Sequence, residues 1–184
     1  HRATAAFKVG EKEYGTGSYV IRMDQPFSRM ADMLLDKQYY NPADPSPYDD
    51  VGWTLGPLFN VVTDRVEDTS VLQARMELVQ GRVTAPAEVR GERSAQAYLI
   101  NYGGEGNLAT FRFAHPELKI DAAEAPFEAA GRSFHAGSFV IPVQGNAANL
   151  GEVLGRAARE YGFVAHGVSA VPEVATHPTA APRV

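Results

Sequence analysis

The chain has 184 residues, of which 45% are hydrophobic and 21% charged, and its formal net charge is −5. This composition is typical of one folded domain or two small ones, and the absence of any run of Lys or Arg argues against a nucleic-acid partner. The chain has no Cys, which excludes disulfides, thiolate nucleophiles and cysteine metal sites. No apolar run approaches the roughly 20 residues that span a bilayer, so no membrane insertion is expected.

One stretch occurs twice, 120 positions apart. Residues 7–21 and 127–141 align without a gap, and both end in Gly-Ser-aromatic-Val-Ile. The match continues at three apolar positions, where Met30, Met33 and Leu34 fall on Leu150, Val153 and Leu154. This pattern predicts a duplicated folding unit, in which Gly17 and Gly137 share one backbone conformation.

The first copy begins with two β-prone runs, residues 1–9 and 13–23, on either side of Gly10, which predicts a hairpin. On this interpretation the repeated stretch is the second strand of each hairpin. Pro26 then introduces an amphipathic helix that extends to about Lys37, because apolar residues recur at intervals of three and four. Its Met30 and Met33 are expected to pack in the core.

Residues 39–50 contain three prolines within six positions and are expected to form a loop. An aromatic and acidic cluster lies at the end of this loop: Tyr48, Asp49, Asp50 and Trp53. The favoured interpretation is that an Asp caps a short helix over residues 51–55 that is interrupted near Gly56-Pro57. The alternative is a recognition surface, and these four residues are the candidate binding residues of the chain.

The second half shows clearer signals. After a strand at 71–79 that ends the first half, strands are expected at 97–102, 118–129, 133–143 and 163–168, and helices from about Leu108 to Pro116 and from 146 to 161. Gly162 is expected to end the last helix, since glycine readily adopts the left-handed conformation found there. Residues 97–170 therefore read β-α-β-β-α-β, the order of a ferredoxin-like, split βαβ unit.

The predicted fold class is α+β, with tandem-repeated β-β-α and β-α-β-β-α-β units of ferredoxin-like type that share a mixed sheet covered by helices. The expected domains are a first repeat unit at 1–80, which lacks its opening strand and helix, a polar connector at 81–94, a second repeat unit at 95–170, and a Pro/Ala-rich linker at 171–184. Because residue 1 is not Met and already lies in a β-prone run, the chain is expected to be a piece of a longer polypeptide.

No catalytic or metal-binding motif is found in the sequence. None of the five histidines lies in His-x-x-Glu or His-Glu-x-x-His, and the pair His115 and Glu117 is interpreted as a solvated corner. Ser18 and Ser138 follow a glycine in each repeat, but neither lies in Gly-x-Ser-x-Gly, so they are expected to serve a shared turn. A hydrolase site assembled from distant residues stays open as a weaker hypothesis.

Four stretches together carry a family resemblance: residues 1–7, Gly17-Ser-Tyr-Val-Ile-Arg-Met-Asp-Gln-Pro26, Pro47-Tyr-Asp-Asp-Val-Gly-Trp-Thr-Leu55 and residues 126–142. They resemble the region that follows the catalytic domain in large bacterial M14-type zinc carboxypeptidase-like proteins. In that family a glutamine-amidotransferase-like domain comes next, and Ala181-Pro-Arg-Val184 resembles the entry to it.

The resemblance implies a non-catalytic accessory module that supports or orients a peptidase domain. No catalytic residue can be placed on this chain, and zinc is expected only in the catalytic domain of the parent protein. The implied partners are other domains of the same polypeptide, and the implied location is periplasmic or secreted. The alternative is a module that binds peptide or cell-wall substrate through the loop around residues 48–53.

Overall fold

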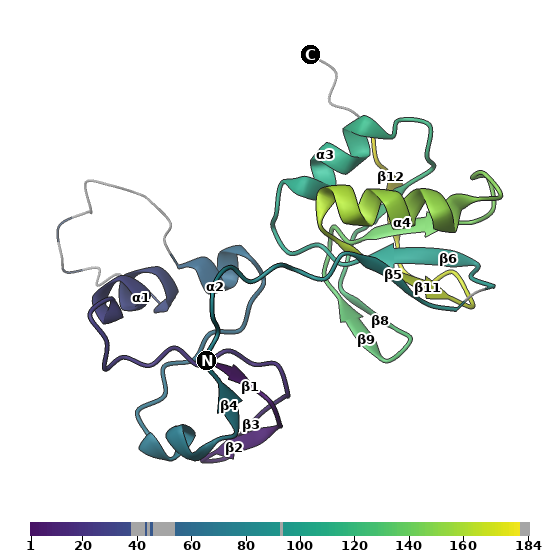
Figure 1. Ribbon diagram of the computed structural model, residues 1–184. Coiled ribbons are helices and arrows are strands. Elements are labelled where there is room, and N and C mark those ends of the chain that lie inside the picture. Colours follow the sequence, from purple (N-terminus) through teal and green to yellow (C-terminus); the bar gives the residue numbers. More distant parts are fainter. Residues whose placement is uncertain (38–42, 44, 46–53, 93, 181–184) are drawn as a thin grey trace. The chain divides into compact units, whose positions relative to one another are not determined.

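The structure is a computed structural model that describes residues 1–37, 43, 45, 54–92 and 94–180 (Figure 1). The chain divides into two compact units, His1–Val83 and Thr84–Val184. The expected mixed α+β class is confirmed, because the described residues form four α-helices and a six-stranded mixed sheet.

The second unit is built on the six-stranded sheet, with the order β12-β7-β10-β6-β11-β5. Its strands are β5 (Glu88–Gly91), β6 (Ala97–Ile100), β7 (Asp121–Ala123), β10 (Phe139–Pro142), β11 (Val164–Val168) and β12 (Thr176–Pro178). All neighbours run antiparallel except β11 and β5, which run parallel. Strand β6 is buried along its whole length, as its four apolar residues predict.

Two helices, α3 (Asn107–Ala114) and α4 (Leu150–Tyr161), lie on one face of this sheet (Figure 1). Helix α4 is amphipathic, and its buried residues follow the helical period: Leu150, Leu154, Ala157 and Ala158. As predicted, α4 ends at Gly162, whose φ of 76° is left-handed.

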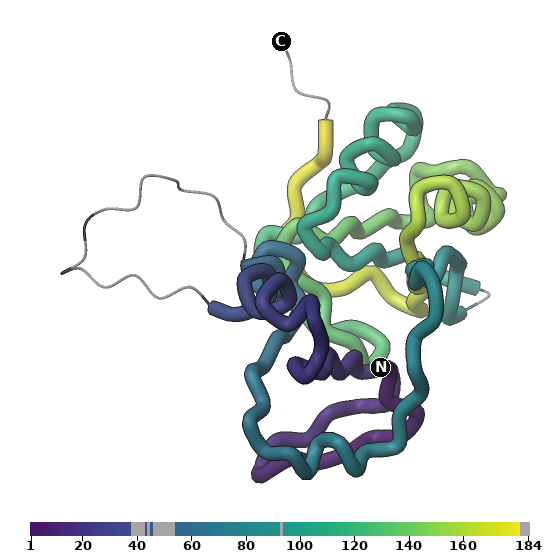
Figure 2. Tube along the Cα trace, turned by 60° about the vertical axis from the view of Figure 1, so that its left-hand side comes forward, coloured from purple at the N-terminus to yellow at the C-terminus, as the bar shows by residue number. Residues whose placement is uncertain are grey.

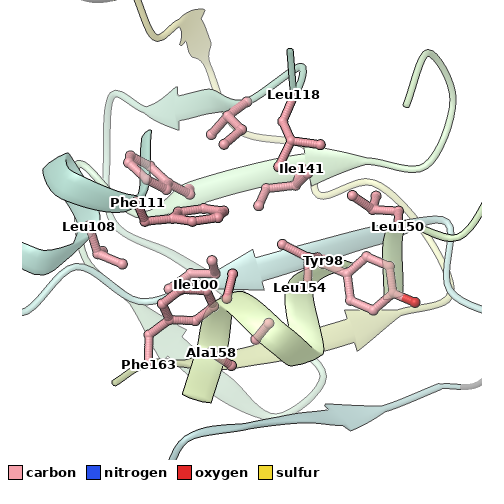
Figure 3. Packing of buried hydrophobic residues seen from close by; sticks show 14 of the residues in the cluster. Tyr98, Ile100, Leu108, Phe111, Leu118, Ile141, Leu150, Leu154, Ala158 and Phe163 are labelled. Carbon is pink, nitrogen blue, oxygen red and sulfur yellow. The ribbon is translucent and has the colours of Figure 1, made fainter. Parts of the chain in front are cut away.

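The core of the second unit has two parts, one on each face of the sheet. On the helical face, Phe111 of α3 lies among Ile100, Ile141 and Phe163 (Figure 3). On the opposite face, a hairpin of β8 (Phe127–Ala129) and β9 (Arg132–Phe134) covers the sheet, and Phe134 packs with Leu99 and Val140. The sheet is therefore apolar on both sides.

The first unit has shorter elements. Its strands are β1 (Arg2–Ala3), β2 (Phe7–Val9), β3 (Lys12–Tyr14) and β4 (Met76–Glu77), and its helices are α1 (Ser28–Leu35), α2 (Leu55–Leu58) and the 3-10 helix η1 (Thr69–Gln73). Strands β2 and β3 form a hairpin, and α1 and α2 lie side by side (Figure 2). An ion pair of 2.5 Å between Lys12 and Asp64 ties the hairpin to the later part of the unit.

The predicted connector and linker each contribute a strand to the six-stranded sheet, which their composition did not indicate. Residues 81–94 contain β5, which pairs in parallel with β11, and residues 171–184 contain β12, which pairs with β7. The Arg112 guanidinium also donates hydrogen bonds of 3.1 and 2.8 Å to the carbonyl oxygen of Thr179. Strand pairing with residues distant in the sequence orders these polar segments. Their local composition does not indicate this pairing.

The expected interruption at Gly56-Pro57 is also wrong, because α2 contains both residues. Pro57 lies in the first turn of this helix, where the backbone N–H has no intrahelical partner and its loss costs little. The expected helix over 51–55 lies largely outside the described residues.

The repeated stretch has the same hairpin and turn in both units, but it continues as strand β10 only in the second, whereas the first has an isolated bridge at Tyr19. The hairpin strands end at Tyr14 and Phe134, and a turn then separates them from the following segment. The prediction for the two glycines is confirmed, since φ is 92° at Gly17 and 84° at Gly137. The Gly-Ser-aromatic-Val-Ile segment thus follows the hairpin and is not its second strand.

Hydrogen bonds around the turns correspond one to one. Gly17 N–H donates to the Ala3 carbonyl oxygen at 2.9 Å, and Gly137 N–H donates to that of Ala123 at 2.7 Å. The aromatic pair of each hairpin stacks, with ring centroids 5.1 Å apart for Phe7 and Tyr14 and 5.0 Å apart for the second copy.

The correspondence extends to the last strand of each unit. Strand β4 pairs with β1 as β12 pairs with β7. Thr4 N–H donates to the Arg75 carbonyl oxygen at 2.9 Å, and Glu124 N–H donates to that of Ala175 at 2.8 Å. The two units therefore share a hairpin, a helix and a returning edge strand.

Candidate functional site

The binding cluster proposed from the sequence, Tyr48, Asp49, Asp50 and Trp53, lies outside the described residues. The described residues instead point to the surface around α1. The sequence did not predict this surface, because its apolar residues have the spacing of a helix that packs in a core.

Helix α1 carries large apolar side chains that no part of the described chain covers. Phe27 is 68% exposed and Met30 is 56% exposed, and Met33 is exposed as well. The expectation that Met30 and Met33 pack in a core is therefore wrong. The helical spacing was read correctly, but the apolar face that it produces lacks a partner among the described residues.

An apolar groove of about 240 Å³ lies along this face. Its main lining residues are Ile21, Phe27, Met30, Ala31, Leu34 and Leu55. Among the described residues, Gln25 is the polar one of the lining, and none of them contributes a charged side chain. Methionine side chains adapt to differently shaped partners, and exposed apolar patches rimmed by polar residues often mark interaction sites.

One wall of the groove is the edge of an extended segment. Val20 N–H donates to the His1 carbonyl oxygen at 2.8 Å, and the His1 ammonium group donates to the Val20 carbonyl oxygen at 2.8 Å. Successive residues of an extended segment direct their backbone groups to opposite sides, so those of Tyr19 and Ile21 face away from β1. Within the described chain, neither Tyr19 N–H nor Ile21 N–H donates a backbone hydrogen bond.

A second, more polar cavity of about 410 Å³ adjoins the groove and shares Ile21 and Gln25 with it. Arg22 forms a two-point contact with Asp24 on its rim, at 2.9 and 2.5 Å. The hydrogen bonds from Arg22 lower the pKa of the Asp24 carboxyl below its usual value. The Arg22–Asp24 pair neutralises its own charges, while His1 also lines this cavity.

His115 Nδ1 lies 3.1 Å from Glu117 Oε1, as expected for the pair at the helix end, and no cluster of three possible metal ligands occurs among the described residues. Helices long and apolar enough to cross a membrane are also missing from the described part of the chain.

Ser138 has a structural role. It is fully buried, its hydroxyl donates to Asn101 Oδ1 at 3.0 Å, and it accepts from Tyr102 N–H at 3.1 Å. The backbone N–H of Ser138 closes a turn with the His135 carbonyl oxygen at 3.1 Å, as Ser18 N–H does with Gly15 at 3.2 Å. The expected shared turn is therefore confirmed.

His166 on β11 is the described histidine with a resolved electrostatic perturbation. Burial lowers its pKa below 6.5, and the positive charges of Arg132 and Arg90 lower it further, whereas Glu88 opposes them. Its ring meets the edge of Phe134 with centroids 6.1 Å apart. The neutral imidazole thus packs as part of the hairpin side of the sheet.

The first unit has almost no core of its own. Of the 23 buried apolar residues in the described chain, 22 belong to the second unit, and Ala3 is the one in the first. Small domains need a buried apolar core, a disulfide, a metal or a partner to be stable.

No family model matches the chain, and no curated protein or solved structure shows significant similarity to it.

The site therefore offers an open backbone edge beside an uncharged apolar groove. This combination can accept an extended segment through main-chain hydrogen bonds and apolar side chains through the groove.

Proposed function

We propose that this chain is a non-catalytic accessory module of an M14-type zinc metallocarboxypeptidase-like protein, in which it supports or orients the peptidase domain. The resemblance of its sequence to the region after the catalytic domain suggests the parent protein. The observation that carries the accessory role is the contrast between the coreless first unit and its exposed apolar groove. Such a surface is suited to an intramolecular interface with a neighbouring domain.

The proposed module consists of two related units of ferredoxin-like, split βαβ type. Within the second unit, strands β6, β7, β10 and β11 have the order β7-β10-β6-β11 and pair antiparallel throughout, which supports this assignment. The matched turns, hairpins and edge strands support descent of the first unit from the same pattern. On this proposal zinc stays in the catalytic domain of the parent, in the periplasm or outside the cell.

Binding to an M14-type catalytic domain, measured by calorimetry with purified proteins, tests the proposal. We expect the 184-residue chain to bind, Met30→Asp to weaken binding at least tenfold by placing a charge in the groove, and Phe113→Asp to leave it unchanged. Phe113 is the matched control, because it is an exposed apolar helical residue of the second unit. Release of C-terminal residues from peptides by the chain alone, or equal binding by both variants, would contradict the accessory role.

The second candidate function is a module that binds peptide or cell-wall substrate. The open edge at Tyr19 and Ile21 favours it, because peptides commonly bind by adding a strand to such an edge. On this hypothesis Trp53→Ala in the loop around residues 48–53 reduces retention of immobilised peptide or cell-wall material and leaves the melting temperature unchanged. A variant that loses ligand only because it unfolds would remove the basis for assigning that loop to binding.

A further inference from the structure

The groove of the first unit corresponds to a buried interface in the second. The position of Ile21 matches that of Ile141, Met30 matches Leu150, and Leu34 matches Leu154. All three residues of the second unit are fully buried, with exposed fractions of 0%, 1% and 0%. The same positions thus line a core in one unit and an open surface in the other.

Strand β6 and helix α3 cover these positions in the second unit. Strand β6 pairs with β10 along its length, placing Tyr98 opposite Ile141 and Ile100 opposite Phe139. Tyr98, Ile100 and Phe111 join Ile141, Leu150 and Leu154 in one cluster (Figure 3). The Tyr98 hydroxyl lies 2.7 Å from the position that a Cβ on Gly151 would occupy, so the strand fits closely against α4.

The turn after β6 completes this interface. Asn101 Oδ1 accepts hydrogen bonds from the Ser138 hydroxyl and from His135 N–H, both at 3.0 Å. In the first unit the corresponding serine, Ser18, is half-buried and forms no side-chain hydrogen bond within the described chain. Among the described residues of the first unit, no strand, helix or polar turn takes the place of β6, α3 and Asn101.

We propose that a strand–turn–helix segment of the same polypeptide, preceding His1, completes the first unit as Ala97–Ala114 completes the second. Its strand pairs antiparallel with residues 19–22 through Tyr19 and Ile21, and its helix packs against the groove. The described residues that line the groove are uncharged, so the complementary face of the segment is apolar, and a polar residue after the strand binds Ser18. This inference rests on the proposed function, in which the groove is an interface with the preceding domain, and it names the last strand–turn–helix of that preceding region as the part that fills the groove.

The order of elements places the segment before His1. In the second unit β6 and α3 come before β7, and β1 is the counterpart of β7, because Ala3 and Ala123 make matching hydrogen bonds. Since the repeat offset is 120 residues, Ile120 corresponds to the position immediately before His1. A copy of residues 95–120 joined directly to His1 therefore preserves the register of the repeat.

The test uses the chain extended at its N-terminus by a copy of residues 95–120. Amide hydrogen exchange of Tyr19 and Ile21, measured by NMR, is expected to slow by about tenfold or more on addition of the copy, because both N–H groups gain partners. Fluorescence of the apolar dye 1-anilinonaphthalene-8-sulfonate bound to the chain is expected to fall as the groove is covered. The control carries Tyr98→Asp and Ile100→Asp in the added copy alone, and it should restore both signals to those of the unextended chain.

Residues 95–117, supplied as a separate peptide to the 184-residue chain, give the second arm and keep the test independent of how well the fusion folds. Protection of Tyr19 and Ile21 in either arm, absent from the double-Asp control, supports the proposal. Unchanged exchange in both arms overturns it. Concentration-dependent protection of the unextended chain together with dimerisation overturns it in favour of a second copy of the chain.

The two proposals fail separately. Loss of binding to an M14-type catalytic domain with retained protection at Tyr19 rejects the proposed function alone, whereas retained binding without protection rejects the strand–helix segment alone.

Discussion

Met30 on α1 and Leu150 on α4 occupy the same position of the repeated sequence pattern, yet Met30 is 56% exposed and Leu150 is 1% exposed. Equivalent places in the pattern thus make different energetic contributions. Leu150→Ala is expected to destabilise the second unit by about 2–5 kcal/mol through lost burial and a cavity. Met30→Ala is expected to change stability by no more than about 0.5 kcal/mol. Urea titrations followed by NMR signals of each unit measure both values, and equal losses would show that Met30 is buried in solution.

The two turn glycines provide a second test. Ala at either position must adopt a left-handed backbone, which costs about 1–2 kcal/mol. At Gly137 a Cβ would also lie 3.1 Å from the Tyr102 ring, whereas at Gly17 the nearest atom, of Arg2, is 3.7 Å away. Gly137→Ala should therefore destabilise its unit more than Gly17→Ala, as measured by thermal unfolding. Gly15→Ala, which has open space around the new Cβ, is the control and should have the smallest effect.

The matched serines give a third test. Ser138→Ala removes a fully buried hydroxyl that donates to Asn101 Oδ1 and accepts from Tyr102 N–H, and it is expected to cost about 1–3 kcal/mol. Ser18→Ala removes a half-buried hydroxyl with no such partners in the described chain and should be close to neutral. Chemical denaturation of both variants checks the difference, and a larger loss at Ser18 would contradict the assigned hydrogen bonding.

The environment of His166 predicts a pH dependence. Because burial and two arginines lower its pKa in the folded state below 6.5, the unfolded chain binds a proton more readily as the pH falls. The stability contributed by neutral His166 is complete above 6.5 and is lost as the pH falls through the lowered folded pKa. The free energy of unfolding of the second unit should decrease over this range, and His166→Asn should flatten the decrease.

An NMR titration of the His166 ring measures the folded pKa directly. His177→Asn serves as the control, because His177 is exposed beside Glu124 at 3.3 Å and tests another imidazole of the same unit. A His166 pKa at or above the usual value would contradict the burial of the neutral ring.

Local patterns in the sequence predicted the elements that depend on residues close to one another in the chain. The amphipathic period of α4, its Gly162 end and the buried run of β6 were all recognised, and the repeat predicted the shared conformation of Gly17 and Gly137. Strands β5 and β12 were missed, because pairing partners distant in the sequence hold their polar residues in place. The groove was missed for a related reason: the apolar face of α1 has the pattern of a core face, and only the missing partner makes it a surface.

The parallel pairing of β5 with β11 also has a kinetic consequence. Glu88 pairs with Val164, which lies 76 positions later in the chain, and no shorter connection brings β5 into the sheet. Pairing over such a separation requires a large loop to close, which slows folding. During synthesis β5 therefore stays unpaired until α4 and β11 have left the ribosome. The charged side chains of Glu88 and Arg90 disfavour pairing of this unpaired strand with strands of other chains.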